Sequence, residues 1–335
     1  MVGSVTVTNI EVEVEVEPDG VARLVVRWEA DGDGEVDIAT GSTPVASEHH
    51  HELRALAGDR SACLAVPPAG AVRSYVSVTP AAGGAALIGA ERRVGFEGMV
   101  NFRDLGGYRA GPGKRVRWGR VFRSDALSQL TALDRGAFAS LGCRVVYDLR
   151  GANERRDEPD PMDSRWVEIG PGPPPGHRPD PRTLRDARDG ERWLAAEYRW
   201  RLDHAAPAIG SVLTGLAALD DVPAVFHCAG GKDRTGLVAA LLLEWLGVDR
   251  ETVLGDYVLS ARWRTVATER PLLLALQARG MTGAAAAAFL GAPRGVMAEA
   301  LTHIDDAYGG IASYLAGPAG VSRASLDALR ADLLE

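Results

Sequence analysis

Cysteine is scarce in this chain of 335 residues, which contains Cys63, Cys143 and Cys228 and no C-x-x-C pair. Three cysteines far apart in the sequence argue against a disulfide framework, and the missing C-x-x-C pair argues against a zinc ribbon. We expect Cys63 and Cys143 to be buried and inert, because free cysteines commonly are. A reducing compartment is the simplest expectation, so we predict a cytoplasmic protein.

An excess of positive charge is also missing. Lys and Arg number 37 against 45 Asp and Glu, which gives a net charge of −8. This balance argues against general binding to nucleic acid or to an anionic membrane. The apolar run Leu237–Leu243 stops at Glu244, far short of a membrane span. The opening MVGSVTVTNIEVEVEVEP has neither a basic nor an apolar leader segment, so we expect no signal peptide.

The remaining composition is that of a soluble globular protein, with 46% hydrophobic and 24% charged residues. The length suits two domains, which we place at 1–94 and 95–335. Short alternating segments without helical periodicity predict a β-sandwich for the first domain, similar to a fibronectin type III or immunoglobulin-like module. The predicted strands are Ile10–Glu17, Val21–Trp28, Val36–Ala39, Cys63–Val66 and Tyr75–Thr79.

Two local features of the first domain are interpreted as turns or loops. Pro18-Asp19-Gly20 is typical of a turn between two strands. The tract His49-His50-His51 is predicted to be a solvated loop rather than a metal site, because adjacent histidines on a strand face opposite sides.

Strands and helices alternate in the second domain, which predicts an α/β fold with a mostly parallel sheet. We expect strands at Cys143–Arg150, Arg165–Gly170 and Pro223–Cys228, helices at Ala208–Leu219 and Thr235–Gly247, and helical structure over Glu251–Glu335 with a turn at Ala284–Ala288.

The segment HCAGGKDRTG, from His227 to Gly236, lies between a predicted buried strand and an apolar helix. Open α/β folds bind ligands at this end of a strand, and the N-terminus of a helix attracts anions. Gly230 and Gly231 allow successive N–H groups to converge on an anion, and Arg234 offers a planar pair of donors to phosphate oxygens.

Cys228 is predicted to lie at the base of this phosphate cradle. Thiols at helix N-termini near arginine have pKa values of roughly 3.5–7.5, against about 8.5 for a free thiol. A thiolate there can attack phosphorus and form a phosphocysteine that water then hydrolyses. Thr235 donates a hydroxyl to the sulfur and His227 orients the loop. A nucleotide loop of the form G-x-x-x-x-G-K-S/T fails at Asp233, and the H-x-E motif of zinc deaminases is absent.

The same segment matches the H-C-x5-R-S/T signature of cysteine-dependent tyrosine phosphatases and resembles the bacterial tyrosine-phosphatase-like family, whose loop is H-C-x-x-G-K-D-R-T-G. The resemblance covers about residues 96–335. It extends to Asn101–Tyr108 (NFRDLGGY), Val121–Thr131 (VFRSDALSQLT), Asp148–Arg155 (DLRGANER) and Asp306–Leu315 (DAYGGIASYL).

This resemblance implies a metal- and cofactor-free phosphate monoester hydrolase. Its substrates would be phosphoproteins, with phosphoinositides or a small phosphorylated metabolite as alternatives and a catalytically silent phosphate-binding module as a weaker one. The predicted catalytic residues are Cys228, Arg234 and Asp233. The loop residues Ala229, Gly230, Gly231, Lys232, Thr235 and Gly236 would bind the substrate phosphate.

The chain departs from many tyrosine phosphatases because no W-P-D segment follows Arg165–Gly170. A general acid must reach the leaving oxygen. We favour Asp233, inside the loop, over Asp180, whose place between two prolines is typical of a solvated turn.

Charged residues outside the loop are predicted to shape the site through buried ion pairs. They are Arg103, Asp104, Arg123, Asp148 and Arg150. The mixed-charge segment Arg178–Arg201 is predicted to be a loop and a helix, with a lid over the site as one interpretation and a phosphoinositide-binding face as the alternative. The sequence does not identify a partner for the first domain.

Overall fold

The computed structural model describes residues 5–16, 21–66, 73–170, 172–174, 176–218, 221–264 and 266–335. The expected turn at Pro18-Asp19-Gly20 lies outside these residues.

The N-terminal region contains two antiparallel sheets around one hydrophobic core. The first sheet has the strand order β1 (Thr6–Val16), β2 (Ala22–Asp31), β5 (Ser61–Ala65), and the second has the order β4 (His50–Leu56), β3 (Glu35–Gly41), β6 (Tyr75–Pro80), β7 (Leu87–Ala90). Alternation places Val12, Val26 and Trp28 of the first sheet against Val36 and Val78 of the second. The indole Nε1 of Trp28 donates to the Ala57 carbonyl at 3.1 Å, which satisfies its only polar group.

Three predictions for this region are wrong in detail. His50 and His51 open strand β4 instead of a loop, because their backbone pairs with Thr40 and Ala39 of β3. The sequence pattern also missed β7. Cys63 is exposed, because it lies on the outer face of β5.

The C-terminal region is built on a five-stranded sheet in the order β11 (Arg165–Trp166), β10 (Val145–Asp148), β12 (Ala224–His227), β9 (Val121–Ser124), β8 (Arg103–Asp104). The first four strands are parallel and β8 runs antiparallel to β9. The expected α/β fold is therefore confirmed, with a mixed sheet.

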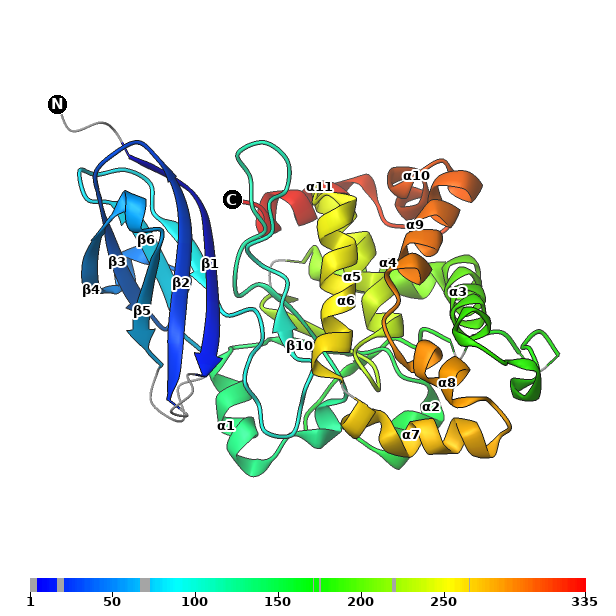
Figure 1. The fold of residues 1–335 in the computed structure, drawn as a ribbon. Coiled ribbons are helices and arrows are strands. Elements are labelled where there is room, and N and C mark those ends of the chain that lie inside the picture. Colours follow the sequence, from blue (N-terminus) through cyan, green and yellow to red (C-terminus); the bar gives the residue numbers. More distant parts are fainter. Residues whose placement is uncertain are drawn as a thin grey trace.

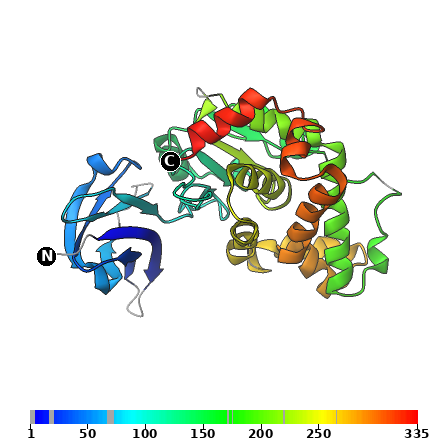
Figure 2. The same ribbon diagram turned by 90° about the horizontal axis from the view of Figure 1, so that it is seen from above.

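Helices cover both faces of this sheet (Figures 1 and 2). On one face, Val146 and Val225 pack with Phe138 of α1 (Ala132–Ser140). On the other face, Tyr147 and Phe226 pack with α4 (Ala206–Leu216) and α5 (Asp233–Leu246). Because neighbours in a strand point to opposite faces, β12 is buried on both sides, which explains its continuous apolar sequence.

The remaining helices follow the sheet or surround it. They are α2 (Ala152–Asp157), α3 (Ala187–His204), α6 (Arg250–Trp263), α7 (Val266–Ala278), α8 (Gly283–Leu290), α9 (Arg294–Tyr308), α10 (Ile311–Ala316) and α11 (Arg323–Leu333). The expected helical C-terminal segment is confirmed, but Ala284–Ala288 belongs to helix α8 and is not a turn. No helix among the described residues is both long and apolar enough to cross a membrane.

Buried polar contacts join the two regions, with β1 on the side that faces the sheet domain (Figure 1). Arg73 donates to the Asp104 carboxylate at 2.6 Å, and both side chains are almost fully buried. Trp118 lies between Arg73 and Arg92, each guanidinium 5.0 Å from its ring. Asp104 also accepts from the Gly119 N–H. Its contacts therefore lie at this junction and not at the phosphate loop, where the sequence analysis had placed it.

Candidate active site

The loop between β12 and α5 turns its carbonyl groups toward the surrounding scaffold. The donors are the Ala126 N–H to Ala229 O at 3.1 Å, Asn101 Nδ2 to Gly230 O at 3.0 Å, and Arg123 Nη2 to Gly231 O at 2.8 Å. Since these three carbonyls point outward, the N–H groups of the same peptides are free to face the inside of the loop. The backbone N–H groups of 229–232 have no acceptor among the described residues.

The loop therefore presents a set of free donors at the N-terminus of α5. No side chain caps this end of the helix within the described residues, although Lys232 occupies the capping position. Free N–H donors at a helix N-terminus form a binding site for an anion such as a phosphoryl group.

Two glycines permit this curled backbone. Gly231 has φ +63°, and a Cβ there would lie 2.5 Å from backbone atoms of Ser124 and Asp125. Gly230 lies against the guanidinium of Arg264, which would collide with a Cβ at 1.4 Å. A larger residue at Gly231 would displace the loop from its scaffold, whereas one at Gly230 would displace the Arg264 guanidinium.

Cys228 is buried at the base of the loop. Burial alone would raise the pKa of its thiol, but the nearby Arg234 guanidinium and the hydroxyl and N–H of Thr235 outweigh burial and lower it. The Thr235 hydroxyl has no nitrogen or oxygen partner among the described residues, which leaves it available to the sulfur. The site thus favours a thiolate, the nucleophilic form of cysteine.

Arg234 is fixed by a carboxylate that the sequence analysis did not select. Its Nη1 and Nη2 donate to the two oxygens of Glu154, in α2, at 2.6 and 2.7 Å. The paired guanidinium lowers the pKa of Glu154 against the effect of burial. Glu154 accepts one hydrogen from each terminal nitrogen, and the guanidinium has three further N–H groups for a substrate.

Asp233 is the first residue of α5, and its carboxylate accepts from Tyr198 Oη at 2.7 Å. Burial opposes its ionisation, but Lys232 at 3.2 Å and Tyr198 together lower its pKa. Asp233 is therefore ionised in the phosphate-free site at neutral pH. Acid catalysis by this residue requires the charge of a bound substrate to raise that pKa.

Lys232 lies in the loop, but its ammonium is directed away from the anion site. It is buried and donates to Phe289 O at 2.9 Å and Gly291 O at 2.6 Å. Its side chain joins the loop to the end of α8, so substrate contact through its ammonium, which the sequence predicted, does not occur in this conformation.

The predicted supporting residues around His227 form a buried charged cluster. His227 Nε2 lies 3.0 Å from Asp160, and Arg150 donates to both Asp148 and Asp160 at 2.8 Å. The two carboxylates and the imidazole have the residue types of a metal site. Because Arg150 already occupies oxygens of both acids, this cluster fits an ion-pair network better than a cation site.

A second buried network supports the other side of the loop. Arg103 and Arg123 both donate to Asp256 of α6, at 3.0 and 2.5 Å. These arginines hold the pKa of Asp256 well below its usual range despite its burial. Since Arg123 also donates to Gly231 O, helix α6 is coupled to the loop through this network.

Asp180 and the segment around it lie outside the site. Asp180 caps the short 3-10 helix Pro181–Thr183 and pairs with Arg182 on the surface. Helix α3 packs one face against α8 and α9. Its residues Tyr198 and Arg201 border the site, since Tyr198 donates to Asp233 and Arg201 lines the pocket that contains Arg234.

Comparison with known proteins agrees with this geometry. Residues 94–335 match the model of the tyrosine phosphatase family. The chain belongs to the tyrosine phosphatase family. It is accordingly a phosphoric monoester hydrolase, as the loop sequence predicted.

Two curated relatives match over most of their length. The triple specificity protein phosphatase PtpB of Mycobacterium tuberculosis is 33% identical over 275 residues, which cover 71% of this chain and 97% of that protein. A protein named as a tyrosine-protein phosphatase in Cupriavidus necator is 27% identical and covers 71% of this chain and 88% of its own length. The solved structure of a pectate lyase from Pectobacterium carotovorum aligns over 27% of this chain and 28% of the lyase chain, at 7% sequence identity. Its TM-score of 0.20 is too low to indicate a shared fold.

Several site residues escaped the sequence analysis because they lie far from the loop in the sequence. They are Glu154, Asp160, Tyr198, Asp256 and Arg264. Glu154 lies inside the DLRGANER segment that the sequence analysis quoted. Its place in that segment was the one sequence signal that could have marked it as a site residue. The other four give no local pattern.

Proposed function

We propose that this protein hydrolyses phosphate monoesters through a phosphorylated Cys228. The observation that carries the proposal is the set of N–H groups at 229–232, which have no acceptor in the described part of the chain, beside a thiol whose pKa is lowered. Such a set of donors binds three phosphoryl oxygens while the sulfur faces the phosphorus.

The reaction has two displacements. The Cys228 thiolate attacks phosphorus, an S–P bond forms, and the P–O bond to the leaving group breaks as that oxygen takes a proton. Water then attacks the same phosphorus, the S–P bond breaks, and inorganic phosphate and the thiolate are released. Arg234 and the loop N–H groups stabilise the charge on the phosphoryl oxygens in both steps. The Thr235 hydroxyl stabilises the departing thiolate.

Asp233 is proposed to donate the proton to the leaving oxygen and to accept one from the attacking water. A phosphate dianion in the loop repels the Asp233 carboxylate and raises its pKa, which opposes the effect of Lys232 and Tyr198. Protonation of Asp233 would thus follow substrate binding.

For the substrate we propose phosphotyrosine and other phosphorylated side chains in proteins. The support is the family and the similarity to a relative named for triple specificity. A phosphoinositide or a small phosphorylated metabolite is the alternative. A panel of phosphopeptides, phosphoinositides and nucleoside or sugar phosphates separates these classes by kcat/KM.

We further propose a domain division at 94/95 and a fibronectin type III-like module before it. Support comes from the three- and four-stranded sheets with the orders β1-β2-β5 and β4-β3-β6-β7, and from the start of the family match at residue 94. A cytoplasmic location also remains a proposal, supported by the three free cysteines.

The proposal is tested with Cys228→Ser. This variant should lose hydrolysis of an aryl phosphate while it still binds inorganic phosphate, because the N–H groups of the loop are unchanged. Wild-type turnover should persist in EDTA. Turnover in Cys228→Ser, or a strict need for Mg²⁺ or Zn²⁺, would contradict the mechanism.

A further inference from the structure

Arg264 is a second guanidinium at the phosphate loop, from outside the signature sequence. It follows directly after α6, whose residues support the loop: Asp256 through Arg123, and Ser260 through Asn101. The guanidinium lies against Gly230, so closely that a Cβ on this glycine would be 1.4 Å from Nη1. Gly230 thus provides the space that Arg264 occupies.

Three other cations near the loop already have partners. Arg234 is bound to Glu154, the Lys232 ammonium to two carbonyls, and Arg123 to Asp256 and Gly231 O. These contacts fix three cations to the scaffold of the loop.

Arg264 is less fully occupied. Its Nη2 pairs with Glu269 at 2.6 Å, and its side chain is only 11% exposed. Its Nε is buried and has no partner among the described residues. Burial opposes the charge of Arg264, but the Glu269 carboxylate, with smaller effects of Asp233 and Cys228, raises its pKa. Arg264 is therefore a permanent cation within electrostatic reach of the nucleophile.

The geometry points to Arg264 as a specificity residue that binds a second anionic group beside the scissile phosphate. This inference rests on the proposed function. When such a substrate occupies the loop, its second anion competes with Glu269 for the guanidinium. A phosphate and a carboxylate share the necessary chemistry, because each accepts two N–H groups from one arginine.

The test uses aryl phosphates that differ only in a second anion: phenyl phosphate, 3- and 4-carboxyphenyl phosphate, and 1,3-phenylene bisphosphate. Wild-type enzyme should have a lower KM for at least one substituted substrate than for phenyl phosphate. Arg264→Gln should remove this preference and raise that KM roughly tenfold, the usual scale for a charge-assisted hydrogen bond. Comparison of the carboxylate and bisphosphate series identifies which anion is preferred.

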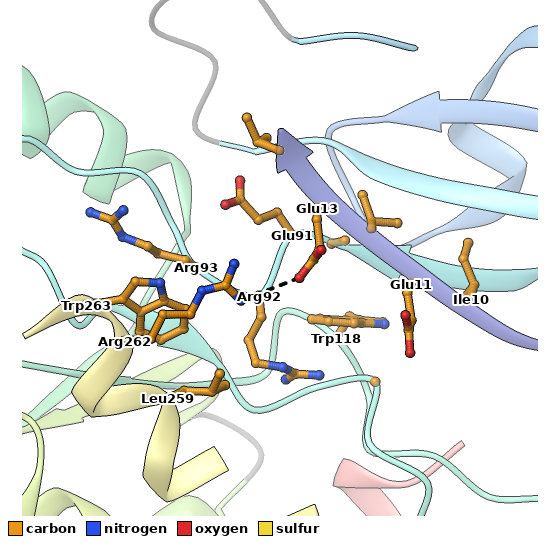
Figure 3. A pocket seen from close by; sticks show the side chains of 14 residues that line it. Ile10, Glu11, Glu13, Glu91, Arg92, Arg93, Trp118, Leu259, Arg262 and Trp263 are labelled. Atoms are coloured by element: carbon orange, nitrogen blue, oxygen red, sulfur yellow. Dashed lines mark ion pairs between the residues drawn. The ribbon is translucent and has the colours of Figure 1, made fainter. Parts of the chain in front are cut away.

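Two further variants make the result specific. Glu269→Gln should strengthen the preference, because it releases Arg264 from its carboxylate. Arg262→Gln is the matched control, since Arg262 is at the same end of α6 but points toward Glu13 of β1, 3.6 Å away (Figure 3). It should leave the preference unchanged.

Three results would overturn the inference: no preference in the wild type, an equal loss on phenyl phosphate and the substituted substrates in Arg264→Gln, or the same loss in Arg262→Gln. Each leaves the proposed function intact if phenyl phosphate is still hydrolysed through Cys228. Failure of the wild type on all four substrates would instead contradict the proposed function.

Discussion

At the scale of single residues, the charged side chains near the thiol are each held by a second side chain. Glu154 fixes Arg234, Asp256 fixes Arg123, and Tyr198 fixes Asp233. These partners keep the donors in position before the substrate arrives, which is the basis of electrostatic catalysis.

Glu154→Gln tests this view of Arg234. The amide keeps the shape of the side chain but loses the second charged acceptor, so the guanidinium is held less firmly. We expect kcat/KM for an aryl phosphate to fall about tenfold or more, because small displacements of a binding group are costly. Glu244→Gln breaks a matched two-bonded pair with Arg250 at the other end of α5, away from the loop, and should change it little. Equal effects of the two variants would contradict the role of Glu154.

The Thr235 hydroxyl sets part of the pH dependence. Catalysis requires the thiolate, so kcat/KM should rise with pH through a pKa below that of a free thiol. Thr235→Val removes a donor that lowers the pKa of Cys228, so the acidic limb should move to higher pH. Thr252→Val, on the surface of α6, is the control. An acidic limb that stays in place in Thr235→Val would show that the hydroxyl does not act on the sulfur.

Asp233→Asn tests the proposed general acid. Acid catalysis contributes roughly 10²–10⁴-fold and matters most for poor leaving groups. Alkyl phosphates should therefore slow far more than nitrophenyl phosphate, and the basic limb of the pH–rate profile should flatten. Asp180→Asn, which alters a surface cap, should change neither. The reverse pattern would place the acid on the proline-rich segment.

At the scale of secondary structure, the strand–loop–helix unit of β12 and α5 depends on close backbone contacts. Gly231→Ala should destabilise the protein by about 1–2 kcal/mol, because a Cβ meets the backbone of Ser124 and φ is +63°. Phosphate binding should weaken as well. Gly255→Ala is the matched change in the open surface of α6 and should stabilise by about 0.5–1 kcal/mol. Denaturant titration of both variants checks the signs, and unaltered stability and phosphate binding in Gly231→Ala would contradict the argument.

The sequence predicted this unit well because its information is contiguous. A buried strand, two glycines, an arginine and an apolar helix follow one another, and Gly247 ends the helix with φ +93°, as expected of a C-terminal glycine. Residues that come from other elements could not be found in this way. Tyr198 and Asp256 reach the loop from α3 and α6, and only the packing of those helices brings them together.

Contacts between distant parts of the chain also overrode two local sequence patterns. His50 and His51 are polar and adjacent, a pattern that favours a loop, yet pairing with β3 makes them part of a strand. The segment Arg178–Arg201 is rich in charge, yet Trp193, Leu194 and Tyr198 fall on one face of α3 and bury it. In both cases backbone pairing or burial outweighed composition.

At the scale of the whole molecule, the two regions are joined through polar contacts, of which the Arg73–Asp104 pair is buried. Besides the Arg73–Asp104 pair, Arg109 and Arg115 both donate to the Thr8 carbonyl of β1, at 2.9 and 2.7 Å. A crevice of about 330 Å³ remains between β1 and the end of α6, lined by Trp118 and Trp263 (Figure 3). Arg262 of α6 lies 3.6 Å from Glu13 of β1 beside this crevice, so the N-terminal region contacts the same helix that supports the phosphate loop.

Asp104→Asn tests the junction. It leaves the buried Arg73 without its charged partner, and removal of one member of a buried pair costs about 3–5 kcal/mol. We expect a lower denaturation midpoint. Asp37→Asn, which breaks a partly exposed pair with Arg54 on the N-terminal sheet, should cost much less. Equal losses of stability in Asp104→Asn and Asp37→Asn would contradict the claim that the buried pair at the junction stabilises the protein more than a surface pair does.

The central claim is that phosphate passes through Cys228. It is tested most directly by mixing the enzyme with an aryl phosphate, quenching with acid within one turnover, and measuring the mass of the protein and its peptides. The account predicts one added phosphoryl group on the peptide that contains Cys228, absent from Cys228→Ser. Full turnover with no phosphorylated protein at any quench time, or with the phosphoryl group on another residue, would contradict it.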